Sequence, residues 1–286
     1  MLPRQVSRLF QPAMKGTVHD RLRHIEGKHN ALVKELRAAF SRGEPTTPGV
    51  CAIEGLRIVE EAIRSGVRIE AVFFSESSEN KAERLLPQLG SQVETLLLPD
   101  KLFSSAVPSE SPQGVAAMVR LKEHSMQHII RRVQSGVLVG VVGLQDPGNL
   151  GTIVRSAEAF GGAGIFIGED SVSPFNPKVI RASAGSLFRL PFARAKTGEL
   201  IPQLKATGVR VMATSSHKGT VLHEVDLRGP TAVLIGAEGS GLPRNVTSVM
   251  DETIVIPHAI QVESLNAGMA ASIVLYEAAR QRSQSI

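Results

Sequence analysis

Short apolar segments that alternate with helix-like segments are the feature of this chain that most restricts its fold. After residue 136, five apolar segments have the length and composition of strands: 137–143, 164–168, 209–214, 231–236 and 253–256. Helical patterns follow them at 151–160, 177–186, 198–206, 243–249 and 265–281. Strands that alternate with helices favour a parallel sheet covered on both faces. The second half of the chain is therefore predicted to be an α/β domain.

The first part of the chain predicts a smaller α/β domain. Strands are expected at 50–53, 69–74, 95–98 and 114–120, and helices at 56–65 and 81–89. A further helix carries Ile25, Leu32, Leu36 and Phe40 on one face and is expected to end at Gly43 and Pro45. These patterns divide the chain into a basic, flexible arm (1–20), a first domain (21–120), a partly helical linker (121–135) and a second domain (136–286).

The excess positive charge lies in the first 44 residues. This segment has nine Lys or Arg and four Asp or Glu, whereas the other residues have 23 of each sign, out of totals of 32 and 27. The asymmetry predicts a polyanionic partner, because phosphate groups bind cations independently of sequence. The alternative is a solvated basic tail that keeps the protein in solution.

Composition and spacing exclude several kinds of site. Cys51 is the only cysteine, which excludes an intramolecular disulfide, and its apolar neighbours indicate an inert buried thiol. His124 and His128 are four residues apart but lack further ligands at a suitable spacing, so no metal site is expected. The chain has no apolar run of membrane-spanning length and no secretory signal, so we expect no membrane association and a cytoplasmic location.

Polar, glycine-rich loops follow predicted strands of the second domain, at the ends where open α/β sheets bind ligands. They cover 146–151, 236–241 and 256–266. In the helix after the first loop, Arg155 lies off the apolar face that contains Ile153 and Ala157. It also lies near the expected N-terminus of that helix, where a cation opposes the helix dipole. A functional arginine and a surface ion pair between Arg155 and Glu158 are both consistent with this position.

The other two loops have simple structural explanations as well. Glycine can supply a tight turn at 236–241, although a turn does not require the carboxylate of Glu238. Ser264 can be the N-cap of the final helix. Motifs of other enzyme classes are absent: the chain has no G-x-G-x-x-G in the right context, no G-x-x-x-x-G-K-[ST] and no G-x-S-x-G. A dehydrogenase, another nucleotide-binding enzyme of this kind and a serine hydrolase are therefore disfavoured.

The three loops together, in this order and spacing, resemble the SpoU (TrmH) family of the SPOUT superfamily. These are RNA ribose 2′-O-methyltransferases that use S-adenosyl-L-methionine (AdoMet). The resemblance covers about 137–282 and rests on four motifs: D-P-G-N-L-G-T-I-V-R-S-A at 146–157, R-A-S-A-G-S at 181–186, I-G-A-E-G-S-G-L at 235–242 and I-P-x(5)-V-E-S-L-N-A at 256–267. More loosely, 50–66 is similar to the ribosomal-protein-like (L30e/L7Ae) substrate domain of members that act on ribosomal RNA.

The resemblance implies a fold and a cofactor site. The fold is a parallel α/β sheet with a deep C-terminal trefoil knot, which pairs as a homodimer through the C-terminal domain. AdoMet binds in the knot and is held mainly by main-chain groups. In this sequence the implied positions are Gly236, Ile256 and Leu265, and Thr214 is a further contact.

The resemblance also implies the catalytic residues. Arg155 is the central one, and because arginine stays protonated we expect it to orient the ribose and stabilise alkoxide charge rather than act as a base. Asn149 would hold the substrate or the arginine, and Glu238 would orient Arg155 or a neighbouring polar group. Ser264 and Asn266 would complete the pocket. No metal is needed, because charge is neutralised when the sulfonium becomes a thioether.

The implied substrate is structured RNA, and the N-terminal domain favours 23S ribosomal RNA. Two alternatives remain open at this point. One is a transfer RNA 2′-O-methyltransferase, and the other is a non-catalytic RNA-binding protein on the same scaffold.

We predict that deletion of residues 1–20 weakens RNA affinity and flattens its dependence on salt, because fewer counterions are released on binding. The dissociation constant, measured over a series of salt concentrations for the full and shortened chains, checks this. An unchanged salt slope would identify the arm as a passive tail.

Overall fold

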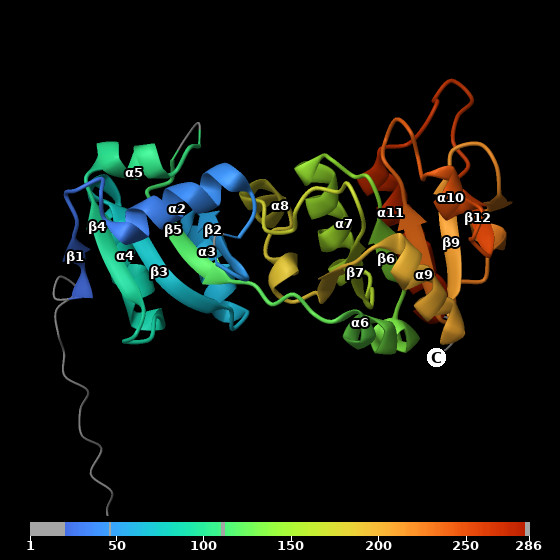
Figure 1. Cartoon of the computed structure of the whole chain (residues 1–286), viewed down its shortest axis with the longest axis horizontal. Helices are drawn as coiled ribbons and strands as arrows, with labels where there is room; N and C mark the ends of the chain where they lie inside the picture. The colour runs from blue at the N-terminus through green and yellow to red at the C-terminus, as the bar shows by residue number, and fades with distance from the viewer. Residues whose placement is uncertain (1–20, 46, 110–111, 284–286) are drawn as a thin grey trace, which may run out of the picture.

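The structure is a computed structural model that describes residues 21–45, 47–109 and 112–283. The predicted arm at 1–20 lies outside these residues. Within them the chain forms two sheets, one in each half of the sequence, which lie side by side in Figure 1.

The first sheet is mixed. Its spatial order is β1 (Arg23–His24), β4 (Glu94–Leu98), β3 (Arg68–Ser75), β5 (Val115–Arg120) and β2 (Val50–Glu54). The β1, β4 and β3 strands are parallel, and β5 pairs antiparallel with both β3 and β2. The helices around it are α2 (Ala31–Arg42), α3 (Leu56–Arg64), α4 (Asn80–Leu85) and α5 (Asp100–Ala106). Gly43 ends α2 in the left-handed conformation, as predicted.

The second sheet is parallel throughout its described strands, which confirms the predicted fold class. Its spatial order is β10 (Thr220–Val221), β12 (Glu252–Val255), β9 (Arg210–Ser215), β11 (Thr231–Ile235), β6 (Leu138–Val141), β7 (Gly164–Ile167) and β8 (Phe192–Arg194). The chain enters it through α6 (Met126–Arg132), so the segment between the sheets is partly helical, as predicted.

Helices cover both faces of the second sheet. They are α7 (Pro147–Ala159), α8 (Pro177–Ala182), α9 (Thr197–Ala206), α10 (Arg244–Thr247) and α11 (Ala267–Ser283). Alternate strand residues face opposite cores: Val139 and Val233 belong to the cluster that includes residues of α7 and α11, whereas Leu138 and Leu234 belong to the cluster that includes residues of α6 and α9.

Some predicted boundaries are wrong. The helix expected at 177–186 ends at Ala182, because Ala184 and Gly185 adopt positive φ angles of 50° and 91°. The helix expected at 151–160 begins earlier, at Pro147. The first helix begins only at Ala31, after its cap Asn30, so Ile25 lies outside it. The apolar pattern does not reveal β1, β8, β10 or α5, because each is too short for a clear periodicity.

The two sheets share one continuous hydrophobic core. The cluster that contains Cys51 and Val115 of the first sheet also contains Val139 and Leu150 of the second half. Figure 1 shows α8 between the two sheets, where it packs on both α7 and β2. The relative position of the two halves is therefore fixed by packing and not only by the linker.

The β12 strand is inserted between β9 and β10, although β9 and β10 are consecutive in the sequence. The short connection from β9 to β10 must therefore cross the chain of β12. Gly219 lies at this crossing with φ of 146°, and a Cβ atom there would be 2.3 Å from the carbonyl oxygen of Thr253. Only glycine fits this crossing without a shift of the backbone.

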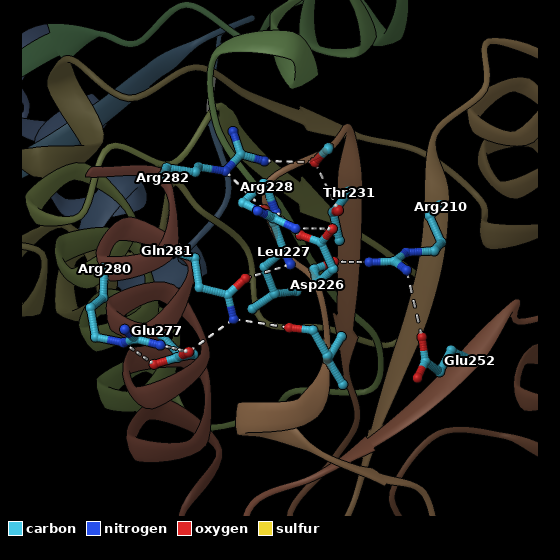
Figure 2. Close-up of polar contacts among 12 residues, drawn as sticks. Arg210, Asp226, Leu227, Arg228, Thr231, Glu252, Glu277, Arg280, Gln281 and Arg282 are labelled. Atoms are coloured by element: carbon cyan, nitrogen blue, oxygen red, sulfur yellow. Dashed lines mark hydrogen bonds and ion pairs between the residues drawn. The ribbon is translucent and has the colours of Figure 1, made fainter. Parts of the chain in front are cut away.

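The last turns of α11 hold the segment that returns from β10 to β11 (Figure 2). The Gln281 amide donates to the carbonyl of Val225 and accepts from the amide of Leu227. The Arg282 guanidinium donates to the carbonyls of Leu227 and Gly229. Glu277, one turn earlier, pairs with Arg280, which lowers the pKa of its carboxyl to about 2. The C-terminal helix is thereby fixed to a loop more than fifty positions earlier in the chain.

We predict opposite stability changes for two helical glycines. A Cβ on Gly151 in α7 would be 2.3 Å from Cβ of Ala182 and 2.9 Å from the backbone of α8, so Gly151→Ala should lower the free energy of unfolding by about 1–3 kcal/mol. Gly198 in α9 has open space around it, so Gly198→Ala should raise it by about 0.5 kcal/mol. Urea denaturation of both variants checks this, and equal effects would contradict the described contact between α7 and α8.

Candidate active site

The first predicted loop is the beginning of a helix. The Asp146 carboxylate accepts from the amide of Gly148 at 2.7 Å, and Pro147 occupies the first helical position. Asn149 therefore lies in the first turn of α7, where its residue is only 6% exposed. Within the described residues its side chain has no hydrogen-bond partner. A side-chain amide without a protein partner is available to a bound molecule.

Arg155 lies in the middle of α7, not near its N-terminus, so the expected conflict with the helix dipole is wrong. Its side chain is exposed and has no ion pair in the described part of the chain. The alternative pair with Glu158 does not form, because Glu158 binds the guanidinium of Arg189 through both oxygens. Arg155 therefore presents a free cation on the surface of α7.

The 236–241 loop is a tight turn closed by a hydrogen bond from the amide of Gly241 to the carbonyl of Ala237, at 2.9 Å. Gly241 has φ of 65°, and a Cβ on Gly236 would be 2.2 Å from the carbonyl carbon of Gly241. Close packing within the loop thus explains both glycines. The Glu238 side chain is exposed at the tip and has no role in the turn.

The final helix begins at Ala267, and its cap is Asn266 rather than Ser264. The Asn266 side-chain oxygen accepts from the amide of Met269 at 3.2 Å. Ser264 is exposed and lies outside the helix. The interpretation of Ser264 as an N-cap is therefore wrong, and Asn266 has a structural role whatever else it does.

Packing of the sheet and helices brings these segments together. The β6 and β11 strands are neighbours, so the loops that follow them approach each other, and a Cβ on Gly143 would be 3.6 Å from Cβ of Ala237. The hydroxyls of Ser156 on α7 and Ser272 on α11 are 2.6 Å apart. The elements that carry the predicted catalytic residues therefore meet at one edge of the sheet.

A cavity of about 660 Å³ opens at the same edge, beyond the ends of β9 and β12. Its lining consists of Ser216, His217, Val255, Ile256, Pro257, His258, Ala259, Ile260, Gln261, Val262 and Glu263. Ile256 is the one predicted cofactor residue in this lining. Gly236 and Leu265 lie outside it, and the Thr214 hydroxyl donates instead to the carbonyl of Leu234 at 3.2 Å.

Three polar residues of the cavity are not among the predicted site residues: Ser216, His217 and His258. The Nδ1 atom of His258 is 2.8 Å from the carbonyl oxygen of Ile256, which fixes the ring at the cavity. All three follow the ends of β9 and β12, so the rule that points to strand ends would have included them.

Other residues considered in the sequence lie elsewhere. Cys51 is buried in the first sheet, and burial raises the pKa of its thiol, so it is an inert core residue, as predicted. His124 and His128 stack with ring centroids 4.8 Å apart. The described residues contain no group of His, Cys, Asp and Glu side chains able to hold a metal ion. No described helix is long and apolar enough to cross a bilayer.

Comparison with known proteins identifies the family. The model of the SpoU rRNA methylase family matches residues 136–276, and that of the MRM3-like substrate-binding domain matches 30–117. The 23S rRNA (guanosine(2553)-2′-O)-methyltransferase RlmP of Bacillus subtilis is 30% identical, with 89% of this chain and 98% of the relative aligned. The 23S rRNA (uridine(2479)-2′-O)-methyltransferase of Streptomyces viridochromogenes is 32% identical, with 88% of this chain and 91% of the relative aligned.

This chain belongs to the SpoU methyltransferase family. The crystal structure of AviRb from Streptomyces viridochromogenes with AdoMet has a TM-score of 0.79 to it, at 29% identity, over 89% of this chain and 99% of that one. The family uses AdoMet, and the cavity volume is within the range of about 300–1,000 Å³ that is usual for small-molecule sites. Val255 and Ile256 give the lining apolar side chains, and Ser216, His217 and His258 give it polar ones.

We predict that Asn149→Ala lowers the rate of methyl transfer by about 100-fold, the usual cost of one preorganised polar group. Its stability should stay within about 1 kcal/mol, because no hydrogen bond of the folded protein is lost. Single-turnover rates and urea denaturation check both parts, with the exposed Asn80→Ala as the control for an asparagine outside the site. A wild-type rate for Asn149→Ala would remove this residue from the active site.

Proposed function

We propose that this protein transfers the methyl group of AdoMet to a ribose 2′-hydroxyl of 23S ribosomal RNA in the cytoplasm. The observation that carries the proposal is the combination on α7 of an unpaired cation, Arg155, with the side-chain amide of the mostly buried Asn149, and neither has a partner in the described chain. Both lie on α7, the helix that follows β6, in a chain of the SpoU family.

Arg155 acts on the RNA. A 2′-hydroxyl is a weak acid, so its oxygen must be held and its developing negative charge stabilised while its proton passes to solvent water. A permanently protonated guanidinium can bind the neighbouring phosphate and stabilise this charge, but it is a poor base. Because Arg155 has no ion pair to break within the described chain, its cation is free to meet the RNA.

The other predicted residues support this centre. Asn149 holds the ribose or the arginine, and Glu238 at the exposed tip of its loop orients the guanidinium of Arg155. Ser264 and Asn266 extend the pocket at the start of α11, where the Asn266 amide nitrogen is still available after its oxygen caps the helix. These roles follow from position and residue type.

Residues around the cavity hold the cofactor. When bound, AdoMet supplies an electrophilic methyl group whose transfer turns a sulfonium into a neutral thioether. Ile256 lines the cavity directly. Main-chain groups of Gly236 and Leu265, together with Thr214, would complete the cofactor site from the neighbouring segments. The lining residues Ser216, His217 and His258 add polar groups that the sequence prediction omitted.

The first half of the chain binds the RNA. Its match to a substrate-binding domain, and the 23S rRNA substrates named for the two relatives, support ribosomal RNA over transfer RNA. We assign this role to residues 21–120, with 121–135 as the linker and 1–20 as a basic arm. A rigid junction with the second half, built by α8 and the shared core, keeps the bound RNA at a fixed distance from α7.

The C-terminal segment forms the trefoil knot. Insertion of β12 between the consecutive strands β9 and β10 supports this proposal, since the C-terminal chain must pass the connection between them. The fastening of α11 to the 225–229 segment supports it as well (Figure 2). The knot folds the 256–264 loop back into a cavity wall.

The protein is a homodimer through α11. Three large apolar residues project from this helix at intervals of four and three positions: Met269, Ile273 and Tyr276 are 56%, 38% and 57% exposed. This spacing puts them on one helical face. A second copy of the same face would cover them, and it would place two active sites beside the interface.

The test is transfer of a labelled methyl group from AdoMet to 23S ribosomal RNA and to bulk transfer RNA in parallel, followed by mapping of the methylated nucleotide. We predict incorporation into 23S RNA at one ribose. We also predict that Arg155→Ala lowers the rate by about 100- to 1,000-fold. Its AdoMet affinity, measured by calorimetry, should stay unchanged because the side chain acts on the RNA.

The exposed Arg131 of α6 provides the control substitution, Arg131→Ala. Incorporation only into transfer RNA would replace the proposed substrate. If AdoMet binds but 23S RNA, transfer RNA and precursor ribosomal particles all remain unmethylated, the protein is an RNA-binding protein without methyltransferase activity. If Arg155→Ala lowers AdoMet affinity by as large a factor as it lowers the rate, the arginine contacts the cofactor and not the RNA.

A further inference from the structure

Arg189 connects the two halves of the molecule through α7. It lies between α8 and β8, directly after the 3-10 turn at Ser186–Phe188. Its Nε and Nη2 atoms donate to the two carboxylate oxygens of Glu158, at 2.5 and 2.9 Å. Its Nη1 atom donates to Glu61 of α3 and to the hydroxyl of Ser65, the latter at 2.8 Å.

Glu158 is the acidic residue next to Arg155 on the surface of α7. The two positions are three apart in a continuous helix, which is the spacing at which arginine and glutamate side chains form ion pairs. That pair is absent because the guanidinium of Arg189 occupies both oxygens of Glu158. Arg155 consequently has no ion pair in the described part of the chain.

We propose that Arg189 is a positioning residue, which holds Glu158 away from Arg155 so that the Arg155 guanidinium stays free for the RNA. The inference rests on the proposed function of Arg155. It assigns Arg189 no contact with RNA or cofactor: its effect on the reaction passes through Glu158.

The geometry favours Arg189 over Arg155 as the partner of Glu158. A planar guanidinium that meets both oxygens of a carboxylate forms a stronger and more directional pair than a single contact between two mobile side chains. Burial opposes ionisation of Glu158, but hydrogen bonds from Arg189 and Ser186 outweigh it and lower the pKa of the carboxyl. The carboxylate is therefore charged and already satisfied.

The backbone fixes Arg189 in this position. Gly185, four residues earlier, has φ of 91°, and a Cβ atom there would be 2.3 Å from Cγ of Glu61. The turn therefore packs directly on α3 of the first half. Bonds to Glu61 and Ser65 hold the same guanidinium from the other side, so docking of the two halves orients the group that binds Glu158.

Loss of Arg189 would place an unpaired carboxylate one helical turn from Arg155. Glu158 would then pair with the catalytic cation for part of the time, and its negative charge would repel the RNA phosphate. An exposed ion pair of this kind is weak, so the expected loss of rate is about fivefold rather than complete.

A rescue experiment tests the proposal. Single-turnover methylation rates are compared for the wild type, Arg189→Gln, Glu158→Gln and the double variant. We expect Arg189→Gln to be about fivefold slower, with unchanged AdoMet affinity. Glu158→Gln should be close to the wild type. The double variant should regain the rate of Glu158→Gln, because no carboxylate is left to bind Arg155.

Two further variants separate this role from simple stabilisation and from failure of the proposed function. Arg194→Gln breaks a comparable ion pair with Glu123 and Glu44 away from α7, and it should keep the wild-type rate. Arg155→Ala reports whether the arginine matters at all. A wild-type rate for Arg155→Ala would refute the proposed active site. The positioning role of Arg189 would then be refuted as well, because it acts through Arg155.

The proposal for Arg189 fails by itself under two outcomes, provided that Arg155→Ala is inactive. One is a double variant that is as slow as Arg189→Gln, because the defect would then not pass through Glu158. The other is an Arg189→Gln variant with the wild-type rate. Thermal unfolding of each variant shows whether loss of the folded state accounts for a slow rate. If Arg189→Gln does not fold, Arg189→Lys replaces it, because lysine cannot pair with both oxygens of Glu158. The Arg189→Lys variant must then show the same rescue by Glu158→Gln.

Discussion

Close packing of α7 between α8 and α11 is the constraint on which the rest of the molecule depends. Gly151 allows the backbone of α8 to approach α7, and a Cβ on Gly268 of α11 would lie 3.1 Å from the side chain of Thr152. The hydroxyl pair of Ser156 and Ser272 joins the same helices. Small residues at these contacts let three elements meet without strain, and the exposed remainder of α7 is left for Arg155.

The parallel sheet supplies the second requirement, a common edge for the loops. Every described strand of this sheet runs in the same direction, so the segments after β6, β9, β11 and β12 all emerge at one edge. Residues far apart in sequence thereby gather without long connections. Insertion of β12 between β9 and β10 adds the 256–264 loop to this group and forms the wall of the cavity.

Charge pairing at the junction links the two halves to the site. Arg189 joins Glu61 of the first half to Glu158 of α7. Continuous packing beneath these pairs makes the junction stiff. A protein that must bring a bound RNA to a fixed cation benefits from such stiffness, because a small displacement at the site is costly for reaction geometry.

The sequence by itself determined the parallel α/β fold, the order of its main strands and helices, and the family, because hydrophobic periodicity and contiguous motifs are local properties. It also pointed to Arg155 and Asn149 through the motif after β6. Apolar periodicity alone did not place the start of α7, although Asp146 and Pro147 are residues typical of an N-cap and a first helical position. Nor could the sequence show that Glu158 binds Arg189, that Asn266 is the cap of α11, or that His217 and His258 share a cavity. These are contacts between residues far apart in the chain or choices between nearby partners, and only the packed structure decides them.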